Sequence, residues 1–454
     1  MSRSSLIRGC IVILLALAGG CTIHPSGERE ERDAALQSGK PFERRIEARQ
    51  TPSLPQNPTP DQLVDYALLA NAELEQRYWD WRSAIEQIPQ DGTQSTTLNL
   101  AAGTAITNGK TSWGTSTLAL SNDPMTNIKW PGKMDAAAKQ SLENARAAGR
   151  RFIKAKYDLR SKVLGAYYDY ALTAELLRLE QSNQRLLQTT ATVTQARNRA
   201  GSAGQQEVLK AENEAEMSRN EIASLQSQLP SQLATINALL SRPADAPLLL
   251  PTDLPPARSI AYSDGQLVEL AAKQNLELIA LADEVRGRAE GIRLAKLQYV
   301  PDFNLSAGTD LMGVTQSLLG QATIPVFRYE ALNAAIAQAQ ANLRASEAMR
   351  RQAGNDLAAQ VVADITIIHD ADRQLDLLQH TILPRASRIV SLARTSYQAA
   401  NASLLDLLDS QRSLIDIERL SANLQITRDK RLLEIESIAA MDLSGSGPRQ
   451  ASAQ

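Results

Sequence analysis

The sequence predicts a mainly helical protein with a small β part, built from two copies of one structural unit. Two stretches far apart in the chain align with each other, from Asn198 to Glu212 and from Tyr397 to Arg412. Long alanine-rich runs without proline indicate helices, and an aromatic content of 4% is low for a compact core of 454 residues. Short segments with strand periodicity recur at matching places in both copies. Together these observations favour long, thin helices with a few strands.

The chain begins with the pattern of a secretory signal. Arg3 and Arg8 precede a short apolar run that ends at Ala18 and is too short to span a bilayer as a helix. Small residues then lead to Cys21, which resembles a bacterial lipobox. Residues 1–20 are therefore expected to be a signal peptide, and Cys21 the lipidated, palmitate-bearing first residue of the mature protein. An unmodified Cys21 after a plain signal peptide is the alternative.

Cysteine usage excludes a disulfide in the mature chain. The sequence holds two cysteines, and Cys10 lies in the segment expected to be removed. Cys21 would then have no partner within the chain, whatever the redox state of the compartment.

Composition divides the mature chain into a lipidated start, two repeats and their connections. Charged and then proline-rich sequence favours an extended linker, and a second proline-rich stretch lies between the repeats. The expected segments are a linker at 21–60, a first repeat at 61–242, a connector at 243–258, a second repeat at 259–442 and a disordered tail at 443–454.

Each repeat is expected to open with one helix. Gln62–Ile88 has helical periodicity, and its counterpart begins at Gln266. Asn71 and Asn275 lie at matching positions. The next proline comes sooner after Asn71 than after Asn275, so the first helix is expected to be about two turns shorter.

A strand pair should follow each of these helices. Residues 97–106 and 112–120 flank Asn108-Gly109, a dipeptide typical of a hairpin turn. Residues 301–308 and 316–327 form the second pair. Each of the four strands has roughly the length that a tilted transmembrane β-strand needs. Four strands cannot close a barrel alone.

The longest expected helices cannot lie in lipid. A continuous helix from Gly132 to Ala200 would be about 100 Å long, at ~1.5 Å per residue. Its charged, alanine-rich surface requires water around it.

Charge and motifs exclude several classes of function. The net charge of −2, from 48 basic and 50 acidic residues, gives no field that would attract nucleic acid. No arrangement of residues indicates a catalytic site, a cofactor site or a metal site. His369 and His380 would lie on one helix about 16 Å apart, too far to share a metal ion, and are expected to be solvated.

The order of elements and several short motifs resemble the TolC-like outer-membrane efflux factors, and in particular their lipoprotein branch. The motifs are the two turn regions Gly201–Ala211 and Tyr397–Arg412, the Asn-x-Glu-Leu pairs at Asn71 and Asn275, and Pro301-Asp-Phe. Asn122-Asp-Pro-Met and Trp130-Pro-Gly-Lys resemble the members that serve heavy-metal exporters.

The resemblance implies a homotrimer that is not an enzyme. Three chains would close a twelve-stranded barrel in the outer membrane, among its lipids, and their helices would continue it as a coiled-coil tunnel in the periplasm. A periplasmic adaptor and an inner-membrane pump of the RND type would be the partners of this passive conduit. The alternative is a lipid-anchored periplasmic coiled-coil protein, structural or adaptor, without a pore.

The resemblance also implies a periplasmic gate at the second turn. Its residues would be Asp406, Asp409 and Tyr397, with Glu207 as the counterpart of Asp406 in the first repeat. A capping box with Ser403 would also explain Asp406, whereas Asp409 lies beyond the first turn of the helix.

The family's gate arginine has no match, because Ala402 occupies that position. Another group must then hold the closed state, and Arg197 and Arg199 are the candidates.

Overall fold

The computed structural model describes residues 22–49, 52–95, 97–107, 110–122, 127–249, 254–310, 315–399 and 401–443. The expected signal peptide, Cys21, the Asn108-Gly109 turn and most of Asn122-Asp-Pro-Met lie outside the described residues. So does the expected tail from residue 444 onward.

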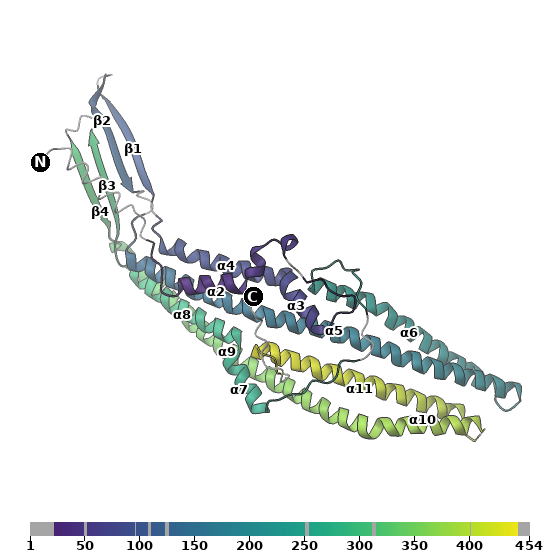
Figure 1. The fold of residues 1–454 in the computed structure, drawn as a ribbon. Helices are drawn as coiled ribbons and strands as arrows, with labels where there is room; N and C mark the ends of the chain where they lie inside the picture. Colours follow the sequence, from purple (N-terminus) through teal and green to yellow (C-terminus); the bar gives the residue numbers. More distant parts are fainter. Residues whose placement is uncertain are drawn as a thin grey trace. The chain divides into compact units, whose positions relative to one another are not determined.

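From residue 60 onward the elements follow the predicted order of helix, strand pair, long helix, turn and helix, twice over (Figure 1). The expectation that residues 21–60 run extended is wrong in part, because a helix forms at Glu28–Ser38. The first half contains α2 (Glu28–Ser38), α3 (Pro60–Ala70), α4 (Ala72–Gly92), β1 (Leu98–Thr107), β2 (Lys110–Asn122), α5 (Pro131–Arg199) and α6 (Gln205–Leu239). The second half contains α7 (Asp264–Gln274), α8 (Leu276–Leu297), β3 (Asp302–Asp310), β4 (Gln316–Thr323), α9 (Tyr329–Leu377), α10 (Leu383–Gln398) and α11 (Leu404–Ala439). Short 3-10 turns occur at Lys40–Glu43, Ile46–Ala48 and Val326–Arg328.

The prediction that each repeat opens with a single helix is wrong. In each repeat an asparagine lies between two shorter helices. Asn71 separates α3 from α4, and its Oδ1 accepts a hydrogen bond from the backbone N–H of Leu74 at 2.9 Å. Asn275 lies between α7 and α8 at the matching place in the second repeat. An asparagine side chain that caps the next helix competes with a continuous helix, and this accounts for the break.

The predicted difference in helix length is also wrong. α4 has 21 residues and α8 has 22. Pro89 lies inside the last turn of α4 rather than ending it. The proline is therefore a poor marker of the helix end.

The prediction of very long helices is confirmed. α5 is continuous over 69 residues. In the second repeat a π-helical turn, Leu378–Ile382, separates α9 from α10. Pro384 follows at the start of α10, where its missing N–H is tolerated. Of the helices in the described ranges, none combines the length and the apolar character that crossing a bilayer requires.

The contacts divide the chain into two compact units, and each unit takes segments from both repeats. The first contains Met1–Lys40, Arg77–Phe152 and Glu277–Ala353, and the second contains Pro41–Gln76, Ile153–Leu276 and Gly354–Gln454.

The first unit holds one antiparallel sheet of four strands, in the order β1-β2-β3-β4. The register gives the sheet two unlike faces. Leu100 pairs with Leu120, Leu120 with Ala307, and Ala307 with Leu318, so one face is apolar. The neighbouring row, Asn99, Ser121, Ser306 and Leu319, lies on the opposite face and is mostly polar. Within the described residues, β1 and β4 are open edges.

The second unit contains two helical hairpins, α5–α6 and α10–α11 (Figure 1). Hydrogen bonds join α6 and α11 to the asparagines that follow the short helices α3 and α7. The Nδ2 of Asn71 donates to the carbonyl of Leu239 at 2.9 Å, and the Nδ2 of Asn275 donates to that of Ile438 at 3.0 Å. Arg258 of the connector binds the buried Glu436 carboxylate through both Nη atoms. In each repeat, the asparagine between the two short helices thus binds a carbonyl at the end of a hairpin helix.

Candidate functional site at the two helical turns

Both hairpins of the second unit close with the same backbone hydrogen bond. In the first turn the N–H of Ser202 donates to the carbonyl of Arg197 at 2.8 Å, and Gly201 has a φ of 72°. In the second turn the N–H of Asn401 donates to the carbonyl of Ser396 at 2.8 Å. Such a bond, from the third residue past a helix back to its last turn, is a common helix ending. The two turns are therefore structural equivalents, as their sequences indicated.

The capping box predicted at Ser403 is confirmed. The Asp406 N–H donates to Ser403 Oγ at 3.2 Å, and the Ser403 N–H donates to Asp406 Oδ2 at 3.3 Å. Glu207 lies at the matching place, where its N–H donates to the carbonyl of Gly204 at 3.0 Å. Asp406 therefore stabilises the start of α11 whatever else it does.

Asp409 has no such local role. Its side chain is exposed and makes no hydrogen bond or ion pair within the part of the chain that the structure describes. It lies one turn from Arg412, which pairs with Glu214 of α6. These residues border a hollow of about 420 Å³ between α6 and α11, lined by Lys210, Glu214, Leu405, Asp406, Leu408, Asp409 and Arg412.

Tyr397 is buried rather than exposed at the turn. Only 1% of its surface is accessible, and its hydroxyl is 2.8 Å from Thr194 Oγ1 of α5. Around it lies a core drawn from both hairpins, made of Leu187, Ala191, Ala211, Ala215, Leu404, Leu407 and Leu408. This residue holds the two hairpins together.

Arg197 joins the first turn to the second. Its guanidinium lies 4.4 Å from the centre of the Tyr397 ring. It donates to the carbonyl of Tyr397 at 2.9 Å and to that of Ser202 at 3.1 Å. Arg199 is exposed and has no interaction within the described ranges. Of the two arginines considered from the sequence, Arg197 makes the connecting contacts.

The histidines are exposed, as predicted. His369 pairs with Asp264 at 2.9 Å, and His380 pairs with Asp376 at 3.1 Å. Among the residues that the structure describes, no three His, Cys, Asp or Glu side chains lie close enough together to hold a metal ion.

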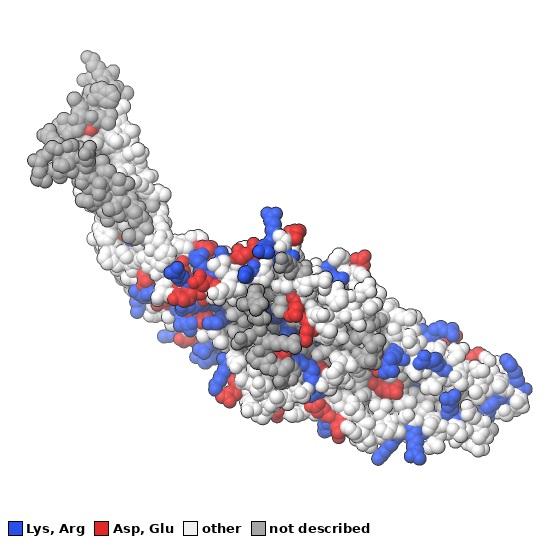
Figure 2. Space-filling model, viewed as in Figure 1, with Lys and Arg blue, Asp and Glu red and all other residues white. Residues whose placement is uncertain are grey.

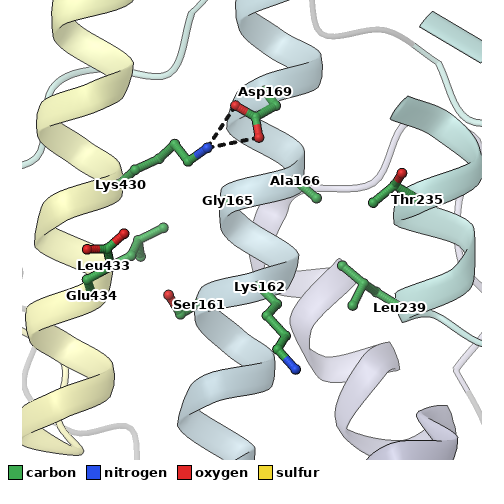
Figure 3. A pocket seen from close by; sticks show the side chains of 10 residues that line it. All are labelled: Ser161, Lys162, Gly165, Ala166, Asp169, Thr235, Leu239, Lys430, Leu433 and Glu434. Carbon is green, nitrogen blue, oxygen red and sulfur yellow. Dashed lines mark hydrogen bonds and ion pairs between the residues drawn. The ribbon is translucent and has the colours of Figure 1, made fainter. Parts of the chain in front are cut away.

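A second hollow of the same unit, of about 370 Å³, lies among α5, α6 and α11 (Figure 3). Its charged groups are already paired. Lys430 contacts both Asp169 oxygens at 2.9 Å, Lys162 reaches Glu73 at 3.2 Å, and Glu434 pairs with Arg431 at 2.6 Å. We assign this hollow no ligand, because the two positive and two negative groups that line it balance.

The comparisons with known proteins agree with this architecture. Residues 267–440 match the model of the outer membrane efflux protein family. The second repeat of the chain is thus similar to this family. The matched segment covers most of the second repeat, including the second turn with Tyr397, Asp406 and Asp409.

Curated proteins similar to this chain occur in Pseudomonas. The pyoverdine export outer membrane protein OpmQ of Pseudomonas putida is 24% identical over 320 residues, which are 66% of this chain and 66% of that protein. OpmQ of Pseudomonas aeruginosa is 24% identical over 308 residues, which are 66% of this chain and 64% of that protein. The alignments therefore leave about a third of each relative unmatched.

Solved structures share the fold over most of the chain. The outer membrane protein VceC of Vibrio cholerae has a TM-score of 0.73 at 18% identity and covers 85% of this chain and 96% of its own. The channel protein CusC has a TM-score of 0.72 at 17% identity, with coverage of 84% and 92%. The outer-membrane channel OprN has a TM-score of 0.71 at 15% identity, with coverage of 90% and 93%. At these identities the likeness concerns the fold.

Sequence reasoning missed the partners that hold the site. It gave no sign that Thr194 binds the Tyr397 hydroxyl, or that Arg412 pairs with Glu214. An alignment of the two repeats shows only which residues are equivalent. Contacts between the hairpins depend on how the helices pack in three dimensions. The residues in contact are about 200 positions apart, so no short stretch of sequence indicates them.

Proposed function

We propose that this protein is the outer-membrane channel component of a tripartite efflux system. Substrates delivered by an inner-membrane pump and a periplasmic adaptor would pass through it without an energy source or a catalytic step of its own. The proposal rests on the four-stranded sheet, which has one apolar face, one polar face and open edges in the described chain. The same chain contains long, water-exposed helices.

The apolar face of the sheet suits lipid. Leu100 and Leu318 are 69% and 68% exposed, although both are leucines in a regular sheet. The four strands contain three charged residues, Lys110, Asp302 and Asp310. Figure 2 shows little charge on the visible described surface of the sheet. An uncharged face with exposed leucines is what the hydrocarbon region of a membrane requires.

The opposite face suits an aqueous lumen. Its residues include Asn99, Ser121 and Ser306, with Gly308 and Ala119 in the next row. Small and polar side chains leave room for water and solutes inside a barrel. An open sheet edge cannot face lipid, because its backbone groups would be unpaired. Further copies of the chain must therefore pair with β1 and β4, and three copies would give twelve strands.

The helices of the second unit also leave faces for further copies. Leu209 and Met217 of α6 are 53% and 64% exposed, and Ile389 and Leu392 of α10 are 56% and 60% exposed. These apolar side chains lie on the outer helices of the two hairpins. We propose that α6 of one copy packs against α10 of the next in a homotrimer.

A lipid anchor at Cys21 fits the residues that follow it. Thr22 Oγ1 lies 3.0 Å from Thr93 Oγ1, and the N–H of Ile23 donates to the carbonyl of Gly92 at 2.8 Å. Thr93 lies between the end of α4 and the start of β1. Acyl chains on Cys21 would thus start close to the sheet that we place in the membrane.

The two turns would face the periplasm and form the gate and the adaptor site. Asp409 is the clearest gate residue, since it has no structural partner in the described chain. Asp406 and Glu207 would add carboxylates around a threefold axis, and Tyr397 would act by holding the hairpins together. A pump of the RND type is the proposed energy source, and the pump would set the cargo.

The experiment that tests this proposal is disulfide cross-linking between the outer strands. Asn99→Cys on β1 is combined in turn with Ser317→Cys, Leu319→Cys or Gln321→Cys on β4. If copies close the sheet, one of these pairs gives covalent dimers and trimers on a non-reducing gel. Asn99→Cys with Ser306→Cys is the control, because Ser306 lies on an inner strand of the same face. Monomers from every pair, with the protein in the membrane, would favour a lipid-anchored coiled-coil protein without a pore.

A further inference from the structure

A partly paired carboxylate is buried between two helices of the second unit. Residues 361–372 of α9 contact residues 428–435 of α11, and we call this contact the seam. Asp364 is 2% exposed, and the side chains around it in α9 belong to an apolar core shared with α11. Its Oδ1 is 3.5 Å from Arg431 Nη1, and its Oδ2 has no hydrogen-bond partner among the described residues. A buried oxygen without a donor is unfavourable for an ionised carboxylate.

Arg431 is shared between two carboxylates. Its Nη1 is 2.6 Å from Glu434 Oε2, so its closer contact is with Glu434 rather than with Asp364. One guanidinium and two ionised carboxylates have a net charge of −1 (1 − 2). A proton on Asp364 would cancel this charge, and its O–H could donate to Glu434. Carboxylates that share a site in this way favour uptake of a proton by one of them.

The seam binds a proton more tightly than water-exposed helices would. Burial and the charge of Glu434 raise the pKa of Asp364 from its ordinary value of 3.8 to about 6, although Arg431 acts in the opposite direction. If the two helices move apart, Asp364 enters water and this pKa falls again. Separation of the helices is therefore linked to release of the proton.

We propose that Asp364, Arg431 and Glu434 form a pH-sensitive latch, which takes up one proton to fasten α9 to α11 and so keeps the channel in its resting state. The inference rests on the proposed channel function and adds its regulation. Acid fills the proton site and tightens the seam. Loss of the proton near neutral pH leaves a buried charge that weakens the seam.

The latch lies close to a break in the helix. The π-helical turn Leu378–Ile382 begins six residues after Asp372 (378 − 372), which pairs with Arg428 in the seam. A π-helical turn interrupts the regular hydrogen bonds, and a helix can change direction there. Beyond this turn α10 leads to Tyr397 and the second helical turn. Release of α9 from α11 therefore allows α10 to move together with the proposed gate.

The shifted pKa gives the size of the effect. Near pH 7 the proton site is mostly empty in both forms, whereas near pH 5 it is mostly filled in the packed form alone. If separation exposes Asp364 fully, the ratio of separated to packed helices should be about tenfold lower at about pH 5 than at about pH 7.

Hydrogen exchange of the seam tests the latch without reference to conduction. Amide protection of residues 361–372 is measured in the reconstituted protein at both pH values, after correction for the effect of pH on the chemical exchange rate. We expect about tenfold higher protection at the lower pH in the wild type. Asp364→Asn should be equally protected at both. Glu434→Gln should move the transition to lower pH, because the charge of Glu434 raises the pKa of Asp364.

His369→Gln is the matched control. Histidine is the side chain that most often responds to pH in this range, and His369 lies five residues from Asp364 on the same helix (369 − 364). The variant should keep the wild-type response. A response that is lost in His369→Gln but kept in Asp364→Asn would overturn the latch. The other charged groups that α7, the connector, α5 and α11 place around the seam are paired, as His369 with Asp264, Lys273 with Glu269, Arg258 with Glu436, and Lys430 with Asp169.

Conductance in planar bilayers separates the latch from the channel function. The opening equilibrium of the wild type should be about tenfold less favourable at about pH 5 than at about pH 7. This difference should be absent from Asp364→Asn, which keeps the carboxylates of the proposed gate. If the protein conducts but both proteins respond to pH alike, the latch does not control the channel, and the proposed function stands without it. If no conductance is seen at any pH, the proposed function itself fails.

Discussion

The contact between the two turns makes a quantitative prediction for Arg197→Ala. The change removes two hydrogen bonds from a guanidinium to carbonyl groups and a cation–π contact with Tyr397. Charge-assisted bonds of this kind contribute about 1.5–3 kcal/mol when buried, and less when partly exposed. With a cation–π contribution of about 0.5–1 kcal/mol, we estimate a total of about 2 kcal/mol. This equals a roughly thirtyfold change in the equilibrium for opening the second turn.

Hydrogen exchange followed by mass spectrometry measures this opening. The Asn401 amide, which closes the second turn, should exchange about thirtyfold faster in the variant if exchange occurs through local opening. Arg199→Ala is the control, because Arg199 is exposed two residues away and makes no contact in the described chain. It should leave the rate within about twofold of the wild type, as surface changes usually do.

Equal acceleration in both variants would refute the reasoning, because a general effect of lost charge would then explain it. An unchanged rate in Arg197→Ala would show that the core around Tyr397 holds the turns without the arginine.

Three further predictions concern the second unit. Tyr397→Phe should lower the free energy of unfolding by about 1 kcal/mol, and Thr194→Val by more, since Thr194 Oγ1 also donates to the Thr190 carbonyl. The double variant should lose little more than Thr194→Val alone, because the two changes share one hydrogen bond; denaturant unfolding of all three checks this. Asn275→Ala should cost about 1–2 kcal/mol and should raise hydrogen exchange at the end of α11, because the Ile438 carbonyl loses a donor. Burial, together with the charge of Glu434, raises the pKa of Asp364 to about 6, so the folded state binds a proton more readily than the unfolded state. Stability should then rise by about 1–3 kcal/mol as the pH falls from about 7 to 4, and thermal unfolding of Asp364→Asn should lack this rise.

The sequence predicted the order of elements well, because that order depends on local patterns. Long proline-free runs, strand periodicity and the two similar turns all lie within short windows, and each corresponds to an observed element. The divided opening helix was missed for a related reason. Asn71 and Asn275 were recognised as equivalent, but their effect requires the carbonyl groups of Leu239 and Ile438 as partners.

The candidate site was predictable in part. Ser403 and Asp406 lie three residues apart, so their capping box could be predicted from spacing. The burial of Tyr397 could not, since it depends on packing between hairpins that lie about 200 residues apart. The gate roles of Asp406, Asp409, Tyr397 and Glu207 remain predictions.

Single-channel conductance in a planar bilayer tests the central claim most directly. We predict discrete conductance steps for the wild type, small because the gate is closed at rest. An Asp406→Ala/Asp409→Ala variant should give steps that differ in size or in cation selectivity, because carboxylates at a narrow end attract cations. Identical steps from both proteins would keep the channel and discard the gate assignment. The absence of steps from either protein, with both confirmed in the membrane, would contradict the account.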